Sequence, residues 1–459
     1  MWSAMSWCRI LLRHMIRQIA INKIRFILGI TIFFLIGYIL GVNFSILTLL
    51  VILYWYLKIL CPTFSIKSNN LLNISFLFVI IFFIGYFMAM KGLSLFYIPY
   101  ALIPMLATLL FNDMGASLLL TLASSITIGS IFPNAFDFTV LFIISGTIAS
   151  ILIQGARRRS TIIRVGLIVG IIQAITLFFI EHFIIFSPDK DLSRYLVLIL
   201  NGIVSSVIAV GILPIFEYLF KTLTNISLLE LADFNHPLLQ RMILEAPGTY
   251  HHSLIVGNLS EAACQAVGAN ALLARIGAYY HDIGKINKPE YFSENQGIAG
   301  NKHDELAPTM SKMVIMNHVK DGVEVARKYK LNQVLIDFIK QHHGTSLVYY
   351  FYRRALERLE DENDLKEDVF RYPGPKPSTK ETAIVLLADS VEAATRALKD
   401  PNPNSITEVV HKVINNKFID GQLDECDLTL KDLEKISKVF IHILSGIYHS
   451  RITYPESSR

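Results

Sequence analysis

The sequence predicts an all-α protein in which a polytopic helical membrane domain precedes an all-helical globular domain. Of the 459 residues, 53% are hydrophobic, and the mean hydropathy of +0.47 is too high for an ordinary soluble protein. The apolar residues are concentrated between 24 and 220, whereas 221–459 holds most of the acidic residues. In this second part, apolar residues recur at spacings of three and four without a convincing alternating pattern, which favours helices over strands.

Eight apolar runs approach or exceed the ~20 residues that a helix needs to cross a bilayer. We expect membrane helices near 24–41, 44–61, 71–90, 94–111, 115–132, 138–154, 162–186 and 195–217. The two helices around Pro99 and Pro104 are the least well defined, because the loop at Asn112–Asp113 is very short. Gly166 and Gly170 form a GxxxG pair, which indicates close packing of neighbouring helices.

The basic residues predict the orientation of these helices. Five of them lie before or at the very start of the first apolar run, and four more lie in "ARRRSTIIR", in and just after the loop between the sixth and seventh helices. With an even number of crossings, both the N-terminus and the globular domain are expected in the cytoplasm, on the inner membrane. No small-residue cleavage site follows the first run, so the start of the chain is interpreted as an anchor and not as a cleaved signal peptide.

The expected domains are a basic cytoplasmic segment, a membrane domain, a helical connector and a globular domain. Their bounds are 1–23, 24–217, 218–245 and 246–459. The last is long enough to bury a core of its own. The four cysteines form no CxxC pair and are expected to be free thiols. The net charge of +5 comes partly from loops beside the membrane, so it does not indicate nucleic-acid binding.

Histidines and aspartates gather in the globular domain, at the ends of or within its expected helices. Those helices lie near 249–267, 270–282, 304–329, 332–342, 346–359, 381–398, 405–417 and 430–448. Eight of the thirteen histidines fall between 236 and 343. The candidates occur in "TYHHS", "YYHDIGK", "MNHVKDG", "KQHHGTS" and "LLADSVEAATR". A lone histidine is usually structural, but two HH pairs and one HD pair spread over five helices indicate a shared site, because unpartnered imidazoles are costly to bury.

Imidazole and carboxylate ligands without cysteine favour iron, manganese or another first-row ion over a structural zinc. The number of candidates is too large for one catalytic ion with an open position. It fits two divalent metal ions that share a bridging carboxylate.

These motifs, together with "LLELADFNHPLLQRMILEAPGTYHHSLIVGNL", resemble the HD superfamily of metal-dependent phosphohydrolases. Within it, the chain is similar to the seven-transmembrane HD family of bacterial cyclic dinucleotide phosphodiesterases, whose characterised members hydrolyse cyclic di-AMP. The similarity runs from about residue 44 to about residue 450. Two departures concern the family pattern. Members usually carry a large extracellular domain between the first two helices, where this sequence has "GVN", and the GYP signature of the cyclic di-GMP enzymes is replaced by "HHGTSLVYYFYRRA".

The resemblance implies a ligand set. One metal would be held by His252, His281, Asp282 and Asp389, and the other by His318, His342 and His343, with Asp282 bridging. The choice of His252 over His251 rests on the family, because spacing shows only that adjacent helical residues point about 100° apart.

The resemblance also implies that Asp282 and Lys285 are catalytic, with Lys285 near the phosphate. From the residues themselves, Arg371 and Lys376 in "RYPGPKPSTK" are candidates for a phosphate-binding rim, with a plain linker as the alternative.

The expected function is a membrane-anchored phosphodiesterase that opens cyclic di-AMP to linear pApA. Its partners would be the cyclic dinucleotide and membrane lipid, with no nucleic-acid polymer, and homo-oligomerisation is left open. One alternative keeps the two metals but changes the substrate, for example to a guanosine polyphosphate. Another is a catalytically inactive receptor that binds a nucleotide. The complete set of ligands weighs against this last alternative.

Overall fold

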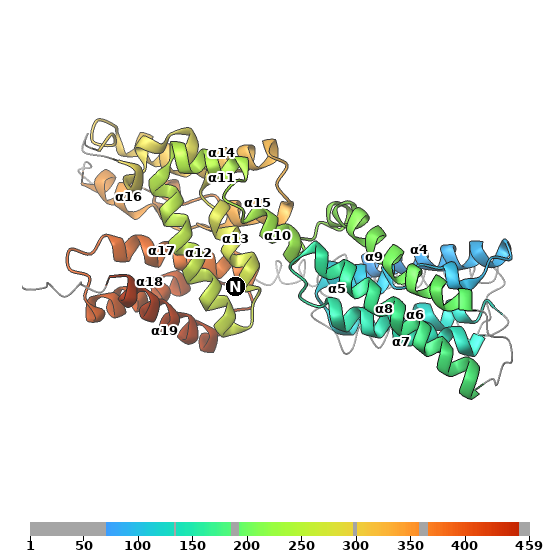
Figure 1. Ribbon diagram of the computed structural model, residues 1–459. Helices are drawn as coiled ribbons and strands as arrows, with labels where there is room; N and C mark the ends of the chain where they lie inside the picture. Colours follow the sequence, from blue (N-terminus) through green and yellow to red (C-terminus); the bar gives the residue numbers. More distant parts are fainter. Residues whose placement is uncertain (1–69, 133–134, 185–191, 297–300, 358–365, 449–459) are drawn as a thin grey trace, which may run out of the picture. The chain divides into compact units, whose positions relative to one another are not determined.

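The computed structural model describes residues 70–132, 135–184, 192–296, 301–357 and 366–448. The expected helices at 24–41 and 44–61 and the basic start of the chain lie outside the described residues. The chain divides into two compact units, and the second begins at Lys221. Both units are helical (Figure 1), and the described residues contain no strand apart from one isolated bridge between Leu347 and Arg371. The all-α prediction is confirmed.

The first unit contains the apolar helices. They are α4 (Asn70–Met90), α5 (Leu102–Phe111), α6 (Met114–Gly129), α7 (Ala135–Ile153), α8 (Arg159–Phe179), which continues into a π-helical turn (Ile180–Ile184), and α9 (Leu192–Phe220). Four stretches are long and apolar enough to cross a membrane, namely Asn70–Met90, Phe136–Ile153, Arg159–His182 and Leu192–Phe220. The protein is therefore a membrane protein.

The expectation of one continuous helix over 94–111 is wrong in its first half. Only a short 3-10 turn, η1 (Leu95–Tyr97), precedes α5, and the backbone at Ile98 is extended. Ile98 stands before Pro99, and a residue before proline disfavours the helical conformation. Asn201 of α9 donates hydrogen bonds to the carbonyls of Phe96 and Ile98 at 2.9 and 2.8 Å, so it satisfies backbone groups at the break.

Helices α8 and α9 pack with their backbones in near contact, as the GxxxG pair predicts. A Cβ atom placed on Gly202 would lie 2.3 Å from the carbonyl oxygen of Gly166 and 2.5 Å from the amide nitrogen of Gly170. A Cβ atom on Gly170 would lie 2.5 Å from the carbonyl oxygen of Ile199. No side chain fits at this crossing, so the small residues allow the approach.

Replacing Gly202 with alanine should force α8 and α9 apart. We expect the Gly202→Ala variant to unfold at a lower temperature than the wild type in detergent, measured by circular dichroism. Gly211→Ala is the matched control, because no atom lies within 4 Å of a Cβ atom at this position on the same helix. Alanine improves helix propensity by up to ~1 kcal/mol, so the control should be neutral or stabilising. Equal melting of the two variants would contradict the packing argument.

The second unit contains ten α-helices in its described part. They are α10 (Asn225–Leu231), α11 (Pro237–Glu245), α12 (Pro247–Val267), α13 (Ala271–Tyr280), α14 (Pro308–Lys328), α15 (Gln333–Gln341), α16 (Tyr349–Leu356), α17 (Lys380–Arg396), α18 (Pro403–Ile419) and α19 (Leu430–Ile447). Short 3-10 turns, including η3 (Ile283–Asn287), η5 (Ser293–Asn295) and η7 (Glu367–Phe370), connect some of them.

Two hydrophobic cores hold this unit together, and α13 contributes to both. One core joins α12 and α13 to α17, α18 and α19. The other joins α13 to α10, α11, α14 and α15. Figure 1 shows α17, α18 and α19 on one side of the unit and α14 and α16 on the other. Since α13 lies between the two cores, the residues that follow its end at Tyr280 are placed deep inside the unit.

Candidate metal centre

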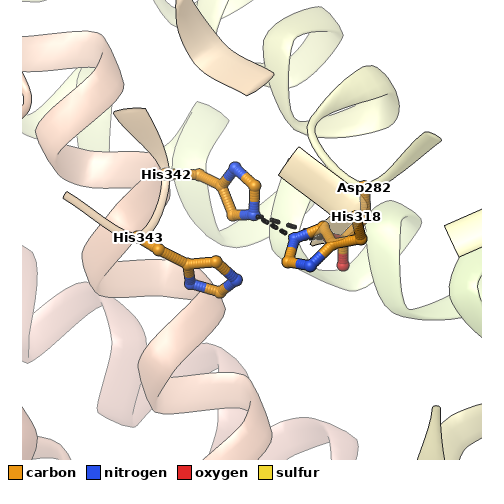
Figure 2. A group of neighbouring side chains, drawn as sticks. All are labelled: Asp282, His318, His342 and His343. Carbon is orange, nitrogen blue, oxygen red and sulfur yellow. Dashed lines mark hydrogen bonds and ion pairs between the residues drawn. The ribbon is translucent and has the colours of Figure 1, made fainter. Parts of the chain in front are cut away.

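The seven side chains that the sequence singled out as ligands lie together in two groups. One group contains Asp282, His318, His342 and His343, and the other contains His252, His281, Asp282 and Asp389. Within each group, the ligand atoms are all within 4.8 Å of one another. Figure 2 shows the first group, with the His342 ring directed toward His318 and Asp282. His252 is buried and belongs to the second group, whereas His251, the first histidine of the "HH" pair, is exposed.

Asp282 is common to both groups, and its two oxygens face different imidazoles. Oδ1 lies 3.3 Å from Nε2 of His318 and 3.5 Å from Nε2 of His342. Oδ2 lies 3.2 Å from Nε2 of His281 and 3.6 Å from Nε2 of His252. The carboxylate is 1% exposed. One buried carboxylate thus lies between four ring nitrogens.

Asp389 flanks the same space from α17. Its Oδ1 lies 3.1 Å from Nε2 of His252, and its Oδ2 lies 3.6 Å from Nδ1 of His343. The residue is 7% exposed. The second acid of the site therefore also contacts an imidazole from each group.

Gly284 allows the turn after Asp282 to pack closely against α14. The turn η3 begins directly after Asp282 and packs against α14. A Cβ atom on Gly284 would lie 1.9 Å from the carbonyl oxygen of His318 and 2.5 Å from the amide nitrogen of Gly322. Only glycine permits this approach of two backbones. The close contact holds Asp282 opposite His318.

The imidazoles are oriented by hydrogen bonds from their other ring nitrogens. Nδ1 of His281, His318 and His342 bonds to the backbone carbonyl three residues earlier, at 2.6, 2.5 and 2.9 Å respectively. A carbonyl can only accept, so each Nδ1 carries the hydrogen. In the neutral ring, Nε2 then presents its lone pair toward Asp282 and the shared space.

Glu392 orients the fourth imidazole. Its Oε2 lies 2.7 Å from Nδ1 of His252, and the residue is 1% exposed. Glu392 and Asp389 are three residues apart on α17, so both point from one face of that helix. A carboxylate behind a histidine ligand fixes the ring and raises its basicity.

Lys285 supplies a positive charge to the centre. Its Nζ lies 2.6 Å from Oδ2 of Asp282 and 2.8 Å from Oε1 of Glu294. Burial disfavours the ammonium, but the carboxylates of Asp282 and Glu294 outweigh it and raise the pKa of Lys285. Burial likewise disfavours the Asp282 carboxylate, and the neighbouring His281 and Lys285 hold its pKa well below the usual range. Both groups are therefore charged at neutral pH.

The imidazoles differ in charge. Burial opposes protonation of His281, but the adjacent Asp282 and Asp389 raise its pKa to about 10. Burial lowers the pKa of His342 to about 4, although Asp282 opposes this shift. Near pH 7, the two rings face Asp282 in opposite protonation states.

Two family models match the chain. The model described as "7TM receptor with intracellular HD hydrolase" matches residues 36–224, and the HD domain model matches residues 249–394, which include all seven side chains. The chain belongs to the family of 7TM receptors with an intracellular HD hydrolase. The resemblance stated from the motifs is confirmed.

Curated relatives of this HD family bear the name cyclic-di-AMP phosphodiesterase PgpH. The protein from Bacillus subtilis is 43% identical over 370 residues, which are 79% of this chain and 52% of the relative. The protein from Listeria monocytogenes is 39% identical over 406 residues, which are 85% of this chain and 52% of the relative. The chain thus spans about half the length of the curated relatives that it matches.

A crystal structure of the HD domain of L. monocytogenes PgpH in complex with cyclic-di-AMP is also similar. The two sequences are 48% identical, and the TM-score is 0.45. The match covers 47% of this chain and 100% of the crystallised chain.

Arg371 and Lys376, the two expected rim residues, make polar contacts with other groups of the HD unit. Arg371 pairs with Asp420 at 2.8 Å and with Glu367, and it also donates to the carbonyl of Thr345 at 3.0 Å. Lys376 pairs with Asp424 at 3.3 Å. In the described residues, the polar contacts of both side chains are with these groups and not with the seven clustered side chains.

Sequence reasoning missed Glu392, Glu294 and Lys417. The spacing of Asp389 and Glu392 in "ADSVE" carried a signal, because positions three apart share a helix face. Glu294 and Lys417 carried no such signal. Glu294 contacts Lys285 across an irregular segment. Lys417 contacts Ser346, which is distant in the sequence.

Gly284→Ala should disturb the centre through the backbone alone. We expect lower stability and less bound metal in the purified chain, because the new Cβ atom overlaps the His318 carbonyl oxygen. Metal analysis and thermal unfolding would measure both effects. Gly446→Ala on α19 is the control, since its Cβ atom would meet no atom within 4 Å. A Gly284→Ala variant with wild-type metal content and melting would disprove the positional role.

Glu392→Gln should weaken metal binding about 10- to 100-fold at the group that contains His252, as is typical for loss of a partner behind a ligand. Equilibrium dialysis of the full chain against Mn²⁺ would measure this affinity. Glu408→Gln, at an exposed position on α18, is the control. Unchanged Mn²⁺ affinity in Glu392→Gln would show that the carboxylate does not support the ligand.

Proposed function

We propose that the chain is a membrane-anchored, two-metal phosphodiesterase that opens cyclic di-AMP to linear pApA. The observation that carries the proposal is a set of three buried polar atoms that converge without hydrogen-bond partners. They are Nε2 of His252, Nε2 of His281 and Oδ1 of Asp282. An unpartnered buried polar atom costs about 1–3 kcal/mol, so their convergence favours a bound cation. The names of the PgpH relatives support the reaction and the substrate.

The donor set fits divalent transition-metal ions. We assign His252, His281, Asp282 and Asp389 to one ion, and His318, His342 and His343 to the other, with Asp282 shared. Imidazoles and carboxylates without a thiolate suit iron or manganese, which we propose as the metals. When bound, such ions supply Lewis-acid stabilisation of phosphoryl charge and make a water nucleophilic at neutral pH.

The residues of the chain bind and orient. Asp282 joins the two halves of the centre, and its Lys285 partner stays cationic at the edge, with 12% of the Lys285 side chain exposed. A cation at this place would attract the phosphodiester and stabilise negative charge that develops on its oxygens. Burial of most of the remaining ligands limits access of bulk water, which strengthens each electrostatic contact.

The membrane placement follows from the basic residues. We propose that the chain lies in the inner membrane with its N-terminus and HD domain in the cytoplasm, because basic residues are concentrated around the start of α8 and around the start of the first apolar run. The domain bounds proposed above, 24–217 for the membrane part and 246–459 for the HD domain, are part of this proposal. A cytoplasmic site has access to a nucleotide second messenger.

Asp282→Ala should lower the rate of cyclic di-AMP hydrolysis at least ~10³-fold, because both ligand groups lose their shared carboxylate. Chromatography of the products of the full chain with Mn²⁺ would measure it. Asp337→Ala, on the exposed face of α15, is the control.

Cyclic di-GMP and a guanosine polyphosphate are assayed alongside. Turnover of Asp282→Ala at the wild-type rate would refute the two-metal assignment. Exclusive turnover of the guanosine polyphosphate would replace the proposed substrate. A wild-type chain that holds no metal and turns over none of these nucleotides would favour the alternative of a catalytically inactive receptor.

A further inference from the structure

Lys417 differs from the other cations near the metal centre. Its Nζ donates a hydrogen bond to Oγ of Ser346 at 2.7 Å, and no carboxylate oxygen of the described residues lies within 4.0 Å of it. Arg371, Lys376 and Lys380 each have a carboxylate partner. Lys417 also sits near the end of α18 and is only partly exposed. The fold therefore places an ammonium in the HD unit without a carboxylate of the described residues in direct contact.

The position of Ser346 connects this lysine to the centre. Ser346 is three residues after His343, and its carbonyl accepts a hydrogen bond from the Tyr372 amide at 3.0 Å. The Tyr372 ring stacks on the His343 ring with centroids 4.3 Å apart and an angle of 27° between the planes. Lys417 thus reaches from α18 to the segment that forms the wall beside His343. Lys285 lies on η3, so the two lysines come from different elements of the HD unit.

The charges around Lys417 would favour the binding of an anion. Burial lowers the pKa of Lys417, the carboxylates of Asp389 and Asp420 partly offset this, and Arg371 adds to the lowering. Asp389 would be neutralised in part by a bound metal ion, and Asp420 is already paired with Arg371. A buried ammonium in this setting gains most from a ligand that brings its own negative charge.

The chemistry of the proposed substrate supplies such a ligand. A cyclic dinucleotide carries two phosphodiesters, each with one negative charge, and only one of them reacts at a time. The reacting phosphodiester would be met by the metal ions and Lys285. The second one needs another cation if it is to be held inside a partly buried site.

We propose that Lys417, together with the Ser346 hydroxyl, binds the non-reacting phosphodiester of the cyclic dinucleotide. The inference rests on the proposed function and names a residue that determines the substrate class. It predicts a preference for ligands with two phosphates over simple phosphodiesters. The alternative is a purely structural role, in which the aliphatic stem of Lys417 packs against the fold and its ammonium only donates a hydrogen bond to Ser346.

Lys417→Met tests the proposal in the full-length chain, because methionine keeps the stem and removes the charge. With Mn²⁺ present, we expect KM for cyclic di-AMP to rise about tenfold, with kcat within twofold of the wild type. A tenfold change corresponds to about 1.4 kcal/mol. With bis(p-nitrophenyl) phosphate, which has one phosphodiester, KM should not change. Lys417→Arg should restore KM for cyclic di-AMP to within about threefold.

A second measurement does not depend on turnover. Equilibrium dialysis of cyclic di-AMP against the full chain in the presence of a chelator should give a Kd about tenfold higher for Lys417→Met than for the wild type. Lys412→Met, at an exposed position on the same helix, should match the wild type in both measurements. Metal content and circular dichroism confirm that each variant is folded.

The outcomes separate the two proposals. Equal KM and Kd values in Lys417→Met and the wild type would overturn the phosphate site while the phosphodiesterase assignment stands. An equal rise in KM for both substrates would also overturn it, because it would point to the centre itself. If the wild type does not hydrolyse cyclic di-AMP, the proposed function falls, and a tenfold difference in the dialysis Kd would still support Lys417 as a phosphate ligand.

Discussion

The HD unit depends on one buried carboxylate and the four imidazoles around it. Each oxygen of Asp282 faces two ring nitrogens at 3.2–3.6 Å. A carboxylate that is 1% exposed is costly to desolvate unless positive charge or hydrogen-bond donors surround it. The fold must therefore bring α12, α13, α14 and α15 to one point. The two hydrophobic cores that meet at α13 do this, and the backbone contact at Gly284 sets the last spacing.

The ends of two helices help to orient the imidazoles. The last carbonyls of a helix lack partners within the helix. His281 follows the end of α13 and His342 follows the end of α15, and each ring bonds through Nδ1 to a carbonyl in the last turn. One contact thus satisfies a backbone acceptor and directs Nε2 inward. His318 lies inside α14 and uses the carbonyl of Ile315 in the same manner, which shows that the orientation matters more than the helix terminus.

Local sequence patterns predicted the helices and the candidate ligands because both follow from nearby residues. The same patterns failed where distant residues decide. The break before α5 follows from Pro99 but is supported by Asn201, about 100 positions away. The ion pair of Arg371 with Asp420 was not foreseen, because no local pattern joins these two residues. The choice between His251 and His252 needed the resemblance, since only packing on α17 buries the second ring against Glu392.

The buried polar atoms without hydrogen-bond partners indicate that the centre binds a cation and not a water molecule. Several buried polar atoms of the described chain lack a partner singly, among them the hydroxyls of Ser253, Ser260 and Ser311, and one water each could serve them. At the centre, the carboxylates and the inward lone pairs of the neutral Nδ1-protonated imidazoles are acceptors, and His281, whose pKa is raised to about 10, is the exception. A water molecule donates only two hydrogens, so it cannot satisfy this set. Cations can: in the ion-free protein, these are the protons on His281 and the ammonium of Lys285, and each ion that binds must take over part of that charge.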